Sequence, residues 1–220
     1  DLTTGKQLFQ YQDEKLYRPA STEKVVTSVS ALATLGTDYT MNTRLQYTGK
    51  VENDTLKGNF YLVGGFDPEF MDEDLDSLVD IIANSGIRYI ADTLAADVSM
   101  MDSVYWGNGW SWDDVPDSFQ PYMSPLMLNR GCVDVTVVPS EKDSLPLVEC
   151  VPASDYYQVD NDGVSHNPQA GNLRITRNWL YNGNQIHVTG NVSKKTTRTL
   201  SIYTSKDFFF HTFINRLKAK

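Results

Sequence analysis

The spacing of apolar residues predicts alternating helices and strands in the first half of the chain. Residues 21–35 place Val25, Val26, Val29, Leu32 and Ala33 on one stripe, which predicts a helix. Residues 43–48 and 59–63 have the pattern of two strands, joined through a polar turn at 52–54. Helical spacing returns at 71–85, and a strand is expected at 94–98. This order predicts a small α/β lobe.

The second half has mainly strand patterns. Apolar and polar residues alternate at 133–137 and 173–177, with a further short apolar run at 145–151. The pair Asn182-Gly183 predicts a tight hairpin between strands at 178–181 and 185–189, and another strand is expected at 199–203. Residues 207–217 have helical spacing, with an apolar face that consists of Phe209, Phe210, Phe213, Ile214 and Leu217. A mainly β lobe followed by a helix is therefore expected, and the chain as a whole belongs to the α+β class.

Composition narrows the range of partners. The 220 residues contain 19 Lys and Arg against 28 Asp and Glu, for a formal net charge of -9. Nucleic-acid binding depends on clustered basic residues, so a nucleic-acid partner is not expected. The sequence contains no apolar run near the roughly 20 residues that a membrane helix needs, so no transmembrane segment is predicted in this chain.

The cysteines and histidines do not predict a metal site. Two cysteines, Cys132 and Cys150, are too few for a thiolate zinc site, and either buried free thiols or a disulfide between neighbouring strands would account for them. The three histidines, His166, His187 and His211, fall in separate segments without a carboxylate at ligand spacing.

Ser21 and Lys24 are the candidate catalytic pair. Residues three apart on a helix share a face, so the Ser21 hydroxyl and the Lys24 amine can meet. A serine becomes a nucleophile when a neighbouring group takes its proton, and a lysine can do this when it is held neutral. Backbone N–H groups at the helix N-terminus could then help to bind a carbonyl oxyanion. The alternative interpretation is a helix cap next to a solvated lysine.

Four ordered motifs resemble one enzyme family. Residues 19–24 (Pro-Ala-Ser-Thr-Glu-Lys), with Ala-Thr-Leu-Gly at 33–36, resemble the active-site helix of penicillin-binding D-alanyl-D-alanine carboxypeptidases. Residues 57–68 (Lys-Gly-Asn-Phe-Tyr-Leu-Val-Gly-Gly-Phe-Asp-Pro) are similar to a stretch of the carboxypeptidase/endopeptidase type with a large insertion, with Phe66 in place of a usual glycine. Residues 109–114 (Gly-Trp-Ser-Trp-Asp-Asp) and 129–132 (Asn-Arg-Gly-Cys) resemble two further motifs of that type.

The resemblance implies a serine-type D-Ala-D-Ala carboxypeptidase, with or without endopeptidase activity, that acts on peptidoglycan stem peptides. It implies that Ser21 is the nucleophile, that Lys24 is its base and that β-lactams acylate the serine. It also implies that Asp114 binds the free amino group of the stem peptide, which suits a carboxylate. Neither a metal nor an organic cofactor is implied. Core packing is the expected role of Trp110 and Trp112, and it is compatible with a functional Asp114.

The Ser-x-Asn and Lys-Thr-Gly motifs of this family have only weak candidates here. Ser165-His166-Asn167 and Lys195-Thr196-Thr197 are in the right order, but they lie close together, and Thr197 replaces a glycine that lets substrate approach the strand. We expect the true motifs to lie beyond Lys220, so the chain is expected to be a fragment that is cut at both ends and inactive alone.

The expected architecture is a partial penicillin-binding, β-lactamase-like transpeptidase domain with two inserted lobes. Residues 1–40 and 201–220 would belong to the transpeptidase-like domain, 41–104 would form an inserted α/β lobe, and 105–200 an inserted β-rich lobe. Apolar faces of the two terminal segments would then be short of partners and open to a homodimer contact. A peptidoglycan substrate implies export to the periplasm or cell envelope. The alternative function is a non-catalytic envelope module that binds peptidoglycan or a protein partner.

Overall fold

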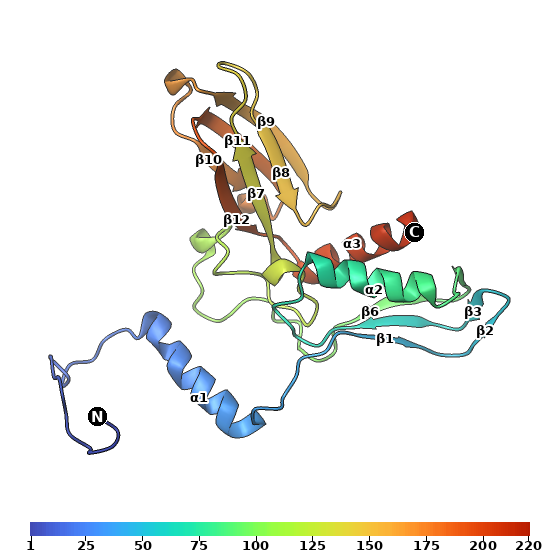
Figure 1. The fold of residues 1–220 in the computed structure, drawn as a ribbon, viewed down its shortest axis with the longest axis horizontal. Helices are drawn as coiled ribbons and strands as arrows, with labels where there is room; N and C mark the ends of the chain where they lie inside the picture. Colours follow the sequence, from blue (N-terminus) through green and yellow to red (C-terminus); the bar gives the residue numbers. More distant parts are fainter. The chain divides into compact units, whose positions relative to one another are not determined.

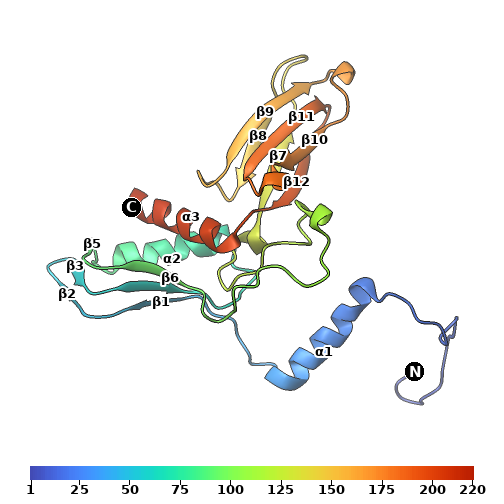
Figure 2. The same cartoon turned by 180° about the vertical axis from the view of Figure 1, so that it is seen from behind.

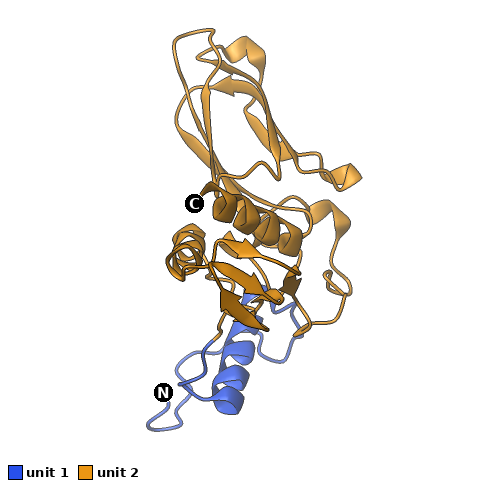
Figure 3. Cartoon of the chain, turned by 90° about the vertical axis from the view of Figure 1, so that its right-hand side faces the viewer, with its two compact units in different colours: residues 1–40 blue, residues 41–220 orange.

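The computed structural model describes all 220 residues and divides them into two compact units. Residues 1–40 form the first unit and residues 41–220 the second (Figure 3).

The first unit contains one helix. A 3-10 turn at Ala20–Thr22 leads into α1 (Glu23–Leu35), and Gly36 ends the helix with a φ of 80°. This confirms the helix predicted at 21–35. The apolar stripe is exposed along its whole length, from Val25 to Leu35.

The second unit begins with an α/β lobe made of six strands and one helix (Figure 1). The middle sheet has the order β1-β4-β6, in which β1 and β4 are antiparallel and β4 and β6 are parallel. A smaller sheet, in the order β2-β3-β5, extends from it. The elements are β1 (Arg44–Tyr47), β2 (Lys50–Glu52), β3 (Thr55–Lys57), β4 (Phe60–Val63), α2 (Asp72–Asn84), β5 (Tyr89–Ile90) and β6 (Leu94–Asp97).

This lobe confirms the pattern expected from the sequence. The predicted hairpin is the β1–β4 pair, with the short β2–β3 hairpin at its tip turning at Asn53 and Asp54, both of which have positive φ. Phe60 and Leu62 on β4 are buried and alternate with half-buried neighbours, as expected of a strand with one face on a core. On α2, the buried residues are Leu75, Leu78, Val79 and Ile82.

The β-rich lobe contains two three-stranded sheets. One has the order β12-β7-β8 and is antiparallel; the other has the order β10-β11-β9, with β9 and β11 parallel (Figures 1 and 2). The strands are β7 (Cys132–Val138), β8 (Leu147–Val151), β9 (Gln158–Ser165), β10 (Arg174–Arg177), β11 (Gln185–Val192) and β12 (Thr196–Ser201). Buried side chains of both sheets belong to one hydrophobic cluster.

Two strand assignments differ from the sequence prediction. Residues 178–181 are not a strand: they contain a 3-10 turn at Trp179–Tyr181, and β11 pairs with β10. The Arg177 side chain reaches into this connection and donates a hydrogen bond to the Gly183 carbonyl, which stabilises a wider turn than the Asn-Gly pair predicts. Strand β9 was missed because its sequence is polar (QVDNDGVS) and it pairs in parallel with a strand distant in sequence.

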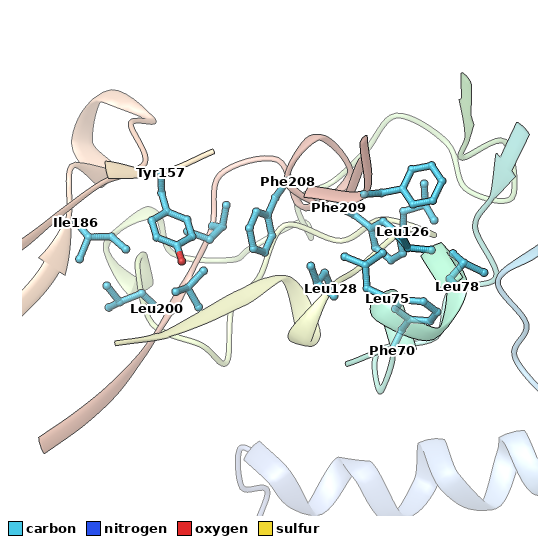
Figure 4. Packing of buried hydrophobic residues seen from close by; sticks show 14 of the residues in the cluster. Phe70, Leu75, Leu78, Leu126, Leu128, Tyr157, Ile186, Leu200, Phe208 and Phe209 are labelled. Atoms are coloured by element: carbon cyan, nitrogen blue, oxygen red, sulfur yellow. The ribbon is translucent and has the colours of Figure 1, made fainter. Parts of the chain in front are cut away.

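Helix α3 (Ser205–Ala219) packs beside α2. Arg216 donates hydrogen bonds to Asp72 and Asp76 of α2, and the Phe209 ring lies 5.0 Å from that of Phe70. The buried cluster continues from these rings into the β-rich lobe (Figure 4). The expectation that the apolar face of this last segment lacks partners is therefore wrong, because Phe208, Phe209 and Phe213 are fully buried. The grouping of residues 201–220 with residues 1–40 in one domain stays a prediction.

The two cysteines are free thiols. Cys150 lies opposite Val135 in the β7–β8 pair, so it shares the face of Val135. Cys132 is three residues from Val135 along β7, and side chains alternate between the two faces of a strand. The two sulfurs therefore point to opposite faces of the sheet, which rules out the disulfide interpretation.

No helix of this fold has both the length and the apolar character that crossing a membrane requires.

Candidate active site

A tight turn before α1 positions the predicted catalytic pair. Ala20 has a positive φ of 45°, and the 3-10 turn that follows carries Ser21 to the start of the helix. The Lys24 Nζ donates a hydrogen bond to the Ser21 Oγ at 3.5 Å. The serine hydroxyl and the lysine amine are thus in contact, as their three-residue spacing predicts.

This pair has the two residue types that a proton transfer from serine to lysine requires. Both side chains are exposed. A lysine accepts a proton only when its amine is neutral, a state that an apolar wall or a neighbouring cation would favour. The pair therefore has the right atoms in contact, and its activation requires a less solvated amine.

Two backbone N–H groups at this turn are already hydrogen-bonded, whereas free N–H groups were expected there. The Thr22 N–H donates to the Pro19 carbonyl at 3.0 Å, and the Glu23 N–H donates to the Ala20 carbonyl. Both donors are used inside the turn. The expectation that helix N-terminal N–H groups help to bind an oxyanion is therefore wrong for these two groups.

Asp114 ends a 3-10 turn, Trp112–Asp114, in the second unit. The residue is half-buried, its N–H donates to the Ser111 carbonyl at 3.3 Å, and its carbonyl accepts from the Asp117 N–H at 2.9 Å. The neighbouring tryptophans are not core residues, because Trp112 is 65% exposed and Trp110 is 37% exposed. Ser21 and Asp114 belong to different units, so their meeting at one substrate stays a prediction.

Of the weak candidates for the Ser-x-Asn and Lys-Thr-Gly motifs, Ser165 is closed to a substrate, whereas Lys195 and Thr197 are exposed. Ser165 is fully buried at the end of β9, where its Oγ accepts a hydrogen bond from the Ser140 N–H. The Thr197 hydroxyl is hydrogen-bonded to that of Thr136 on the neighbouring strand. Both side chains therefore stabilise the β-rich lobe.

The glycine-rich motif after β4 is a site of close backbone packing. A Cβ on Gly65 would lie 2.0 Å from the Asn42 carbonyl oxygen, so only glycine fits there. Phe66 follows with a φ of 61°, a left-handed conformation that glycine adopts without strain. This backbone geometry would suit the glycine that the resembled motif has at this position.

The Asn-Arg-Gly-Cys motif links the two lobes of the second unit. Asn129, Arg130 and Gly131 all have positive φ, which turns the chain sharply into β7. Arg130 forms a bidentate pair with Glu69, and the Arg130 guanidinium lowers the pKa of the Glu69 carboxyl. The motif is therefore structural.

An aromatic groove in the second unit was not predicted. Trp112 from the 3-10 turn lies 5.1 Å, ring centroid to centroid, from Trp179 of the β10–β11 connection. Trp112 was identified only as part of a motif, and Trp179 only as part of a strand. No local pattern joins two rings so far apart in sequence.

Comparisons with known proteins agree on one family. The sequence model of the D-Ala-D-Ala carboxypeptidase 3 (S13) family matches residues 1–220. A D-alanyl-D-alanine carboxypeptidase of an Actinomadura species is 28% identical over 198 residues, covering 87% of this chain and 37% of that protein. The D-alanyl-D-alanine carboxypeptidase DacB of Haemophilus influenzae is 30% identical over 122 residues, covering 56% of this chain and 26% of that protein.

Solved structures show the same fold. The crystal structure of penicillin binding protein 4 from Haemophilus influenzae superposes with a TM-score of 0.74 at 24% identity, covering 96% of this chain and 48% of that one. A structure of the same protein in complex with a β-lactam superposes with a TM-score of 0.61 at 21% identity, covering 91% of this chain and 42% of that one. The chain thus spans less than half the length of these relatives.

Proposed function

Because the chain belongs to the D-Ala-D-Ala carboxypeptidase 3 (S13) family, we propose that it supplies the nucleophile of a serine-type D-Ala-D-Ala carboxypeptidase. The observation that carries the proposal is the hydrogen bond from the Lys24 Nζ to the Ser21 Oγ at the start of α1. The substrate is the D-Ala-D-Ala end of a peptidoglycan stem peptide. The same chemistry applied to a cross-link would give endopeptidase activity.

The reaction passes through an acyl-enzyme. The Ser21 Oγ attacks the carbonyl carbon of the D-Ala-D-Ala bond while the Lys24 Nζ takes the hydroxyl proton. The lysine then gives that proton to the leaving nitrogen, and the terminal D-alanine departs as the C–N bond breaks. Water, deprotonated in the same way, attacks the acyl-serine and releases the shortened peptide together with the free Ser21 hydroxyl. No cofactor takes part in these steps.

Asp114 is proposed to bind the free amino group of the stem peptide. The carboxylate of this half-buried residue on a short turn is suited to a charge-assisted hydrogen bond with an ammonium. The related penicillin binding protein 4 has been solved in complex with a β-lactam, which supports β-lactam acylation of Ser21 here. A peptidoglycan substrate places the protein in the periplasm or cell envelope.

The alternative is a non-catalytic envelope module, and labelling with a fluorescent penicillin separates the two. Because the relatives are more than twice as long as their matched parts, the labelling experiment uses the whole protein and not this segment alone. Wild type and Ser30→Ala, a control on the same helix, should be covalently labelled, and Ser21→Ala should not. Labelling of Ser21→Ala would contradict the role of Ser21 as nucleophile, and a folded wild type that stays unlabelled would favour the binding module.

A further inference from the structure

The second unit contains a groove whose lining is mostly aromatic. Its volume is about 380 Å³, within the usual range for small-molecule sites. One wall comes from the segment that follows the α/β lobe, and the other from the β10–β11 connection and the end of β12. The groove is lined by Trp106, Trp112, Val115, Tyr122, Trp179, Leu180, Asn182 and Tyr203.

The rings of this groove hold one another in place. Besides the Trp112–Trp179 contact, the Tyr122 ring lies 5.1 Å from Trp106 and 5.0 Å from Tyr203, the latter at an interplanar angle of 88°. Tilted and edge-to-face pairs at these distances are favourable arrangements of aromatic rings. The groove is therefore formed before any ligand binds.

A buried arginine supports the groove from behind. Arg177 is 1% exposed; its Nε donates to the Ser201 carbonyl and its Nη1 donates to the Gly183 carbonyl at 2.9 Å. Its guanidinium carbon lies 5.9 Å from the centroid of the Tyr122 ring. The Asn184 side chain bonds both backbone groups of Tyr203, at 2.9 and 3.2 Å. These contacts hold the β10–β11 connection against the end of β12 and the residues that follow it.

The lining has the chemistry of a site for a neutral ligand. No side chain among the eight carries a formal charge at neutral pH. The Asn182 Oδ1 accepts a hydrogen bond from the Tyr122 hydroxyl at 3.5 Å, and the Asn182 amide nitrogen can donate to a ligand. The carboxylates of Asp113 and Asp114 follow Trp112 directly, which disfavours an anionic ligand. Trp112 and Leu180 remain 65% and 62% exposed, so a ligand would cover apolar surface that water now contacts.

We propose that this groove binds a sugar ring of a neutral, N-acetylated glycan. The axial C–H groups of a sugar ring form an apolar face with slightly positive hydrogens, which pack on the negative face of an aromatic ring. Its hydroxyl and acetamido groups remain at the edge, within reach of side-chain amides such as Asn182. A hydrophobic peptide suits the groove less well, because its backbone N–H and C=O groups would lose water and find only Asn182 and the tyrosine hydroxyls as partners.

The site goes beyond the proposed reaction. It uses neither Ser21 nor Lys24, and only the choice of an N-acetylated glycan as ligand rests on the proposed peptidoglycan substrate. Binding to the groove and acylation of Ser21 can therefore fail independently of each other.

The test is a titration of the whole protein with chitotetraose, an uncharged oligomer of N-acetylglucosamine, followed by calorimetry and tryptophan fluorescence. Wild type and Ser21→Ala should bind with equal affinity. Trp112→Ala and Trp179→Ala should each weaken binding at least about tenfold, as expected when a central aromatic contact is truncated. Phe119→Ala removes an exposed ring outside the groove and should leave affinity within about twofold. Cellotetraose, which lacks the acetamido groups, should bind more weakly than chitotetraose.

Three results would overturn the proposal. They are an absence of saturable chitotetraose binding to folded wild type, equal affinity in the tryptophan variants and Phe119→Ala, and tighter binding of an uncharged apolar peptide than of either oligosaccharide. Circular dichroism of each variant shows whether it is folded. If Trp179→Ala does not fold, Trp112→Ala still decides, because the Trp112 side chain is largely exposed.

Discussion

Arg130 donates two parallel hydrogen bonds to Glu69, from Nε to Oε1 at 2.9 Å and from Nη2 to Oε2 at 2.6 Å. The two residues come from different lobes of the second unit: Glu69 precedes α2, and Arg130 lies in the sharp turn into β7. Behind this pair, the Asn129 N–H donates to the Phe70 carbonyl at 3.0 Å. The ion pair thus reinforces the joint between the α/β lobe and the β-rich lobe.

This pair predicts a specific loss of stability in acid. Arg130 lowers the pKa of Glu69 below its ordinary value of 4.5, so the pair stabilises the fold above that value and stops doing so as the pH falls through the lowered pKa. Glu69→Gln should lower the urea midpoint at pH 7, and its difference from wild type should shrink on acidification towards pH 3. Because both side chains are exposed, added salt should also shrink the difference. A difference that is constant between pH 7 and pH 3 would contradict this role.

Asp114→Asn should impair peptide turnover selectively. The carboxylate is proposed to bind a stem-peptide ammonium that β-lactams lack, so acylation by penicillin should be spared. A charge-assisted hydrogen bond predicts a loss of roughly 10- to 100-fold in kcat/KM on peptides that carry the amine. Asp113→Asn, on the adjacent exposed carboxylate, is the control. Equal losses on peptides with and without the amine, or a selective loss in the Asp113 variant, would remove Asp114 from the site.

The buried thiols predict a loss of stability in alkali. Burial raises the pKa of Cys132 to about 12 and that of Cys150 to about 11, from an ordinary value of 9.0. Above pH 9 the unfolded chain releases these thiol protons while the folded chain keeps them, so the free energy of unfolding falls as the pH rises. Cys150→Ala should reduce the fall in the urea midpoint between pH 8 and pH 10.

A thiol reagent should find two free thiols in the unreduced, denatured protein. It should react slowly with the native protein, and a count of zero free thiols would show a disulfide.

Two adjacent phenylalanines of α3 should differ in their contribution to stability. Phe209 is fully buried against Phe70, so Phe209→Ala should lower the free energy of unfolding by about 3–5 kcal/mol. Phe210 is half-buried, and Phe210→Ala should cost less than half as much, because fewer contacts and a smaller cavity are involved. Urea unfolding of both variants measures the difference. Equal costs would mean that α3 does not pack on α2 through the Phe209 face.

The sequence alone predicted the elements whose signals are local. Helices α1, α2 and α3 and most strands follow from the spacing of apolar residues, since this spacing decides which side chains share a face. The contact between Ser21 and Lys24 is predicted in the same way, because residues three apart on a helix share a face. The family could be recognised because its motifs are short contiguous segments.

Only the tertiary structure decided what depends on residues distant in sequence. It paired the polar strand β9 in parallel with β11, although no alternation marks β9 as a strand. It placed Cys132 and Cys150 on opposite faces of a sheet through the register of β7 and β8, which their sequence spacing does not fix. It brought Trp112 to Trp179 and so formed the aromatic groove. The physical reason is that a periodic pattern reports which face of its own element a side chain occupies, while the partner of that face depends on packing between elements.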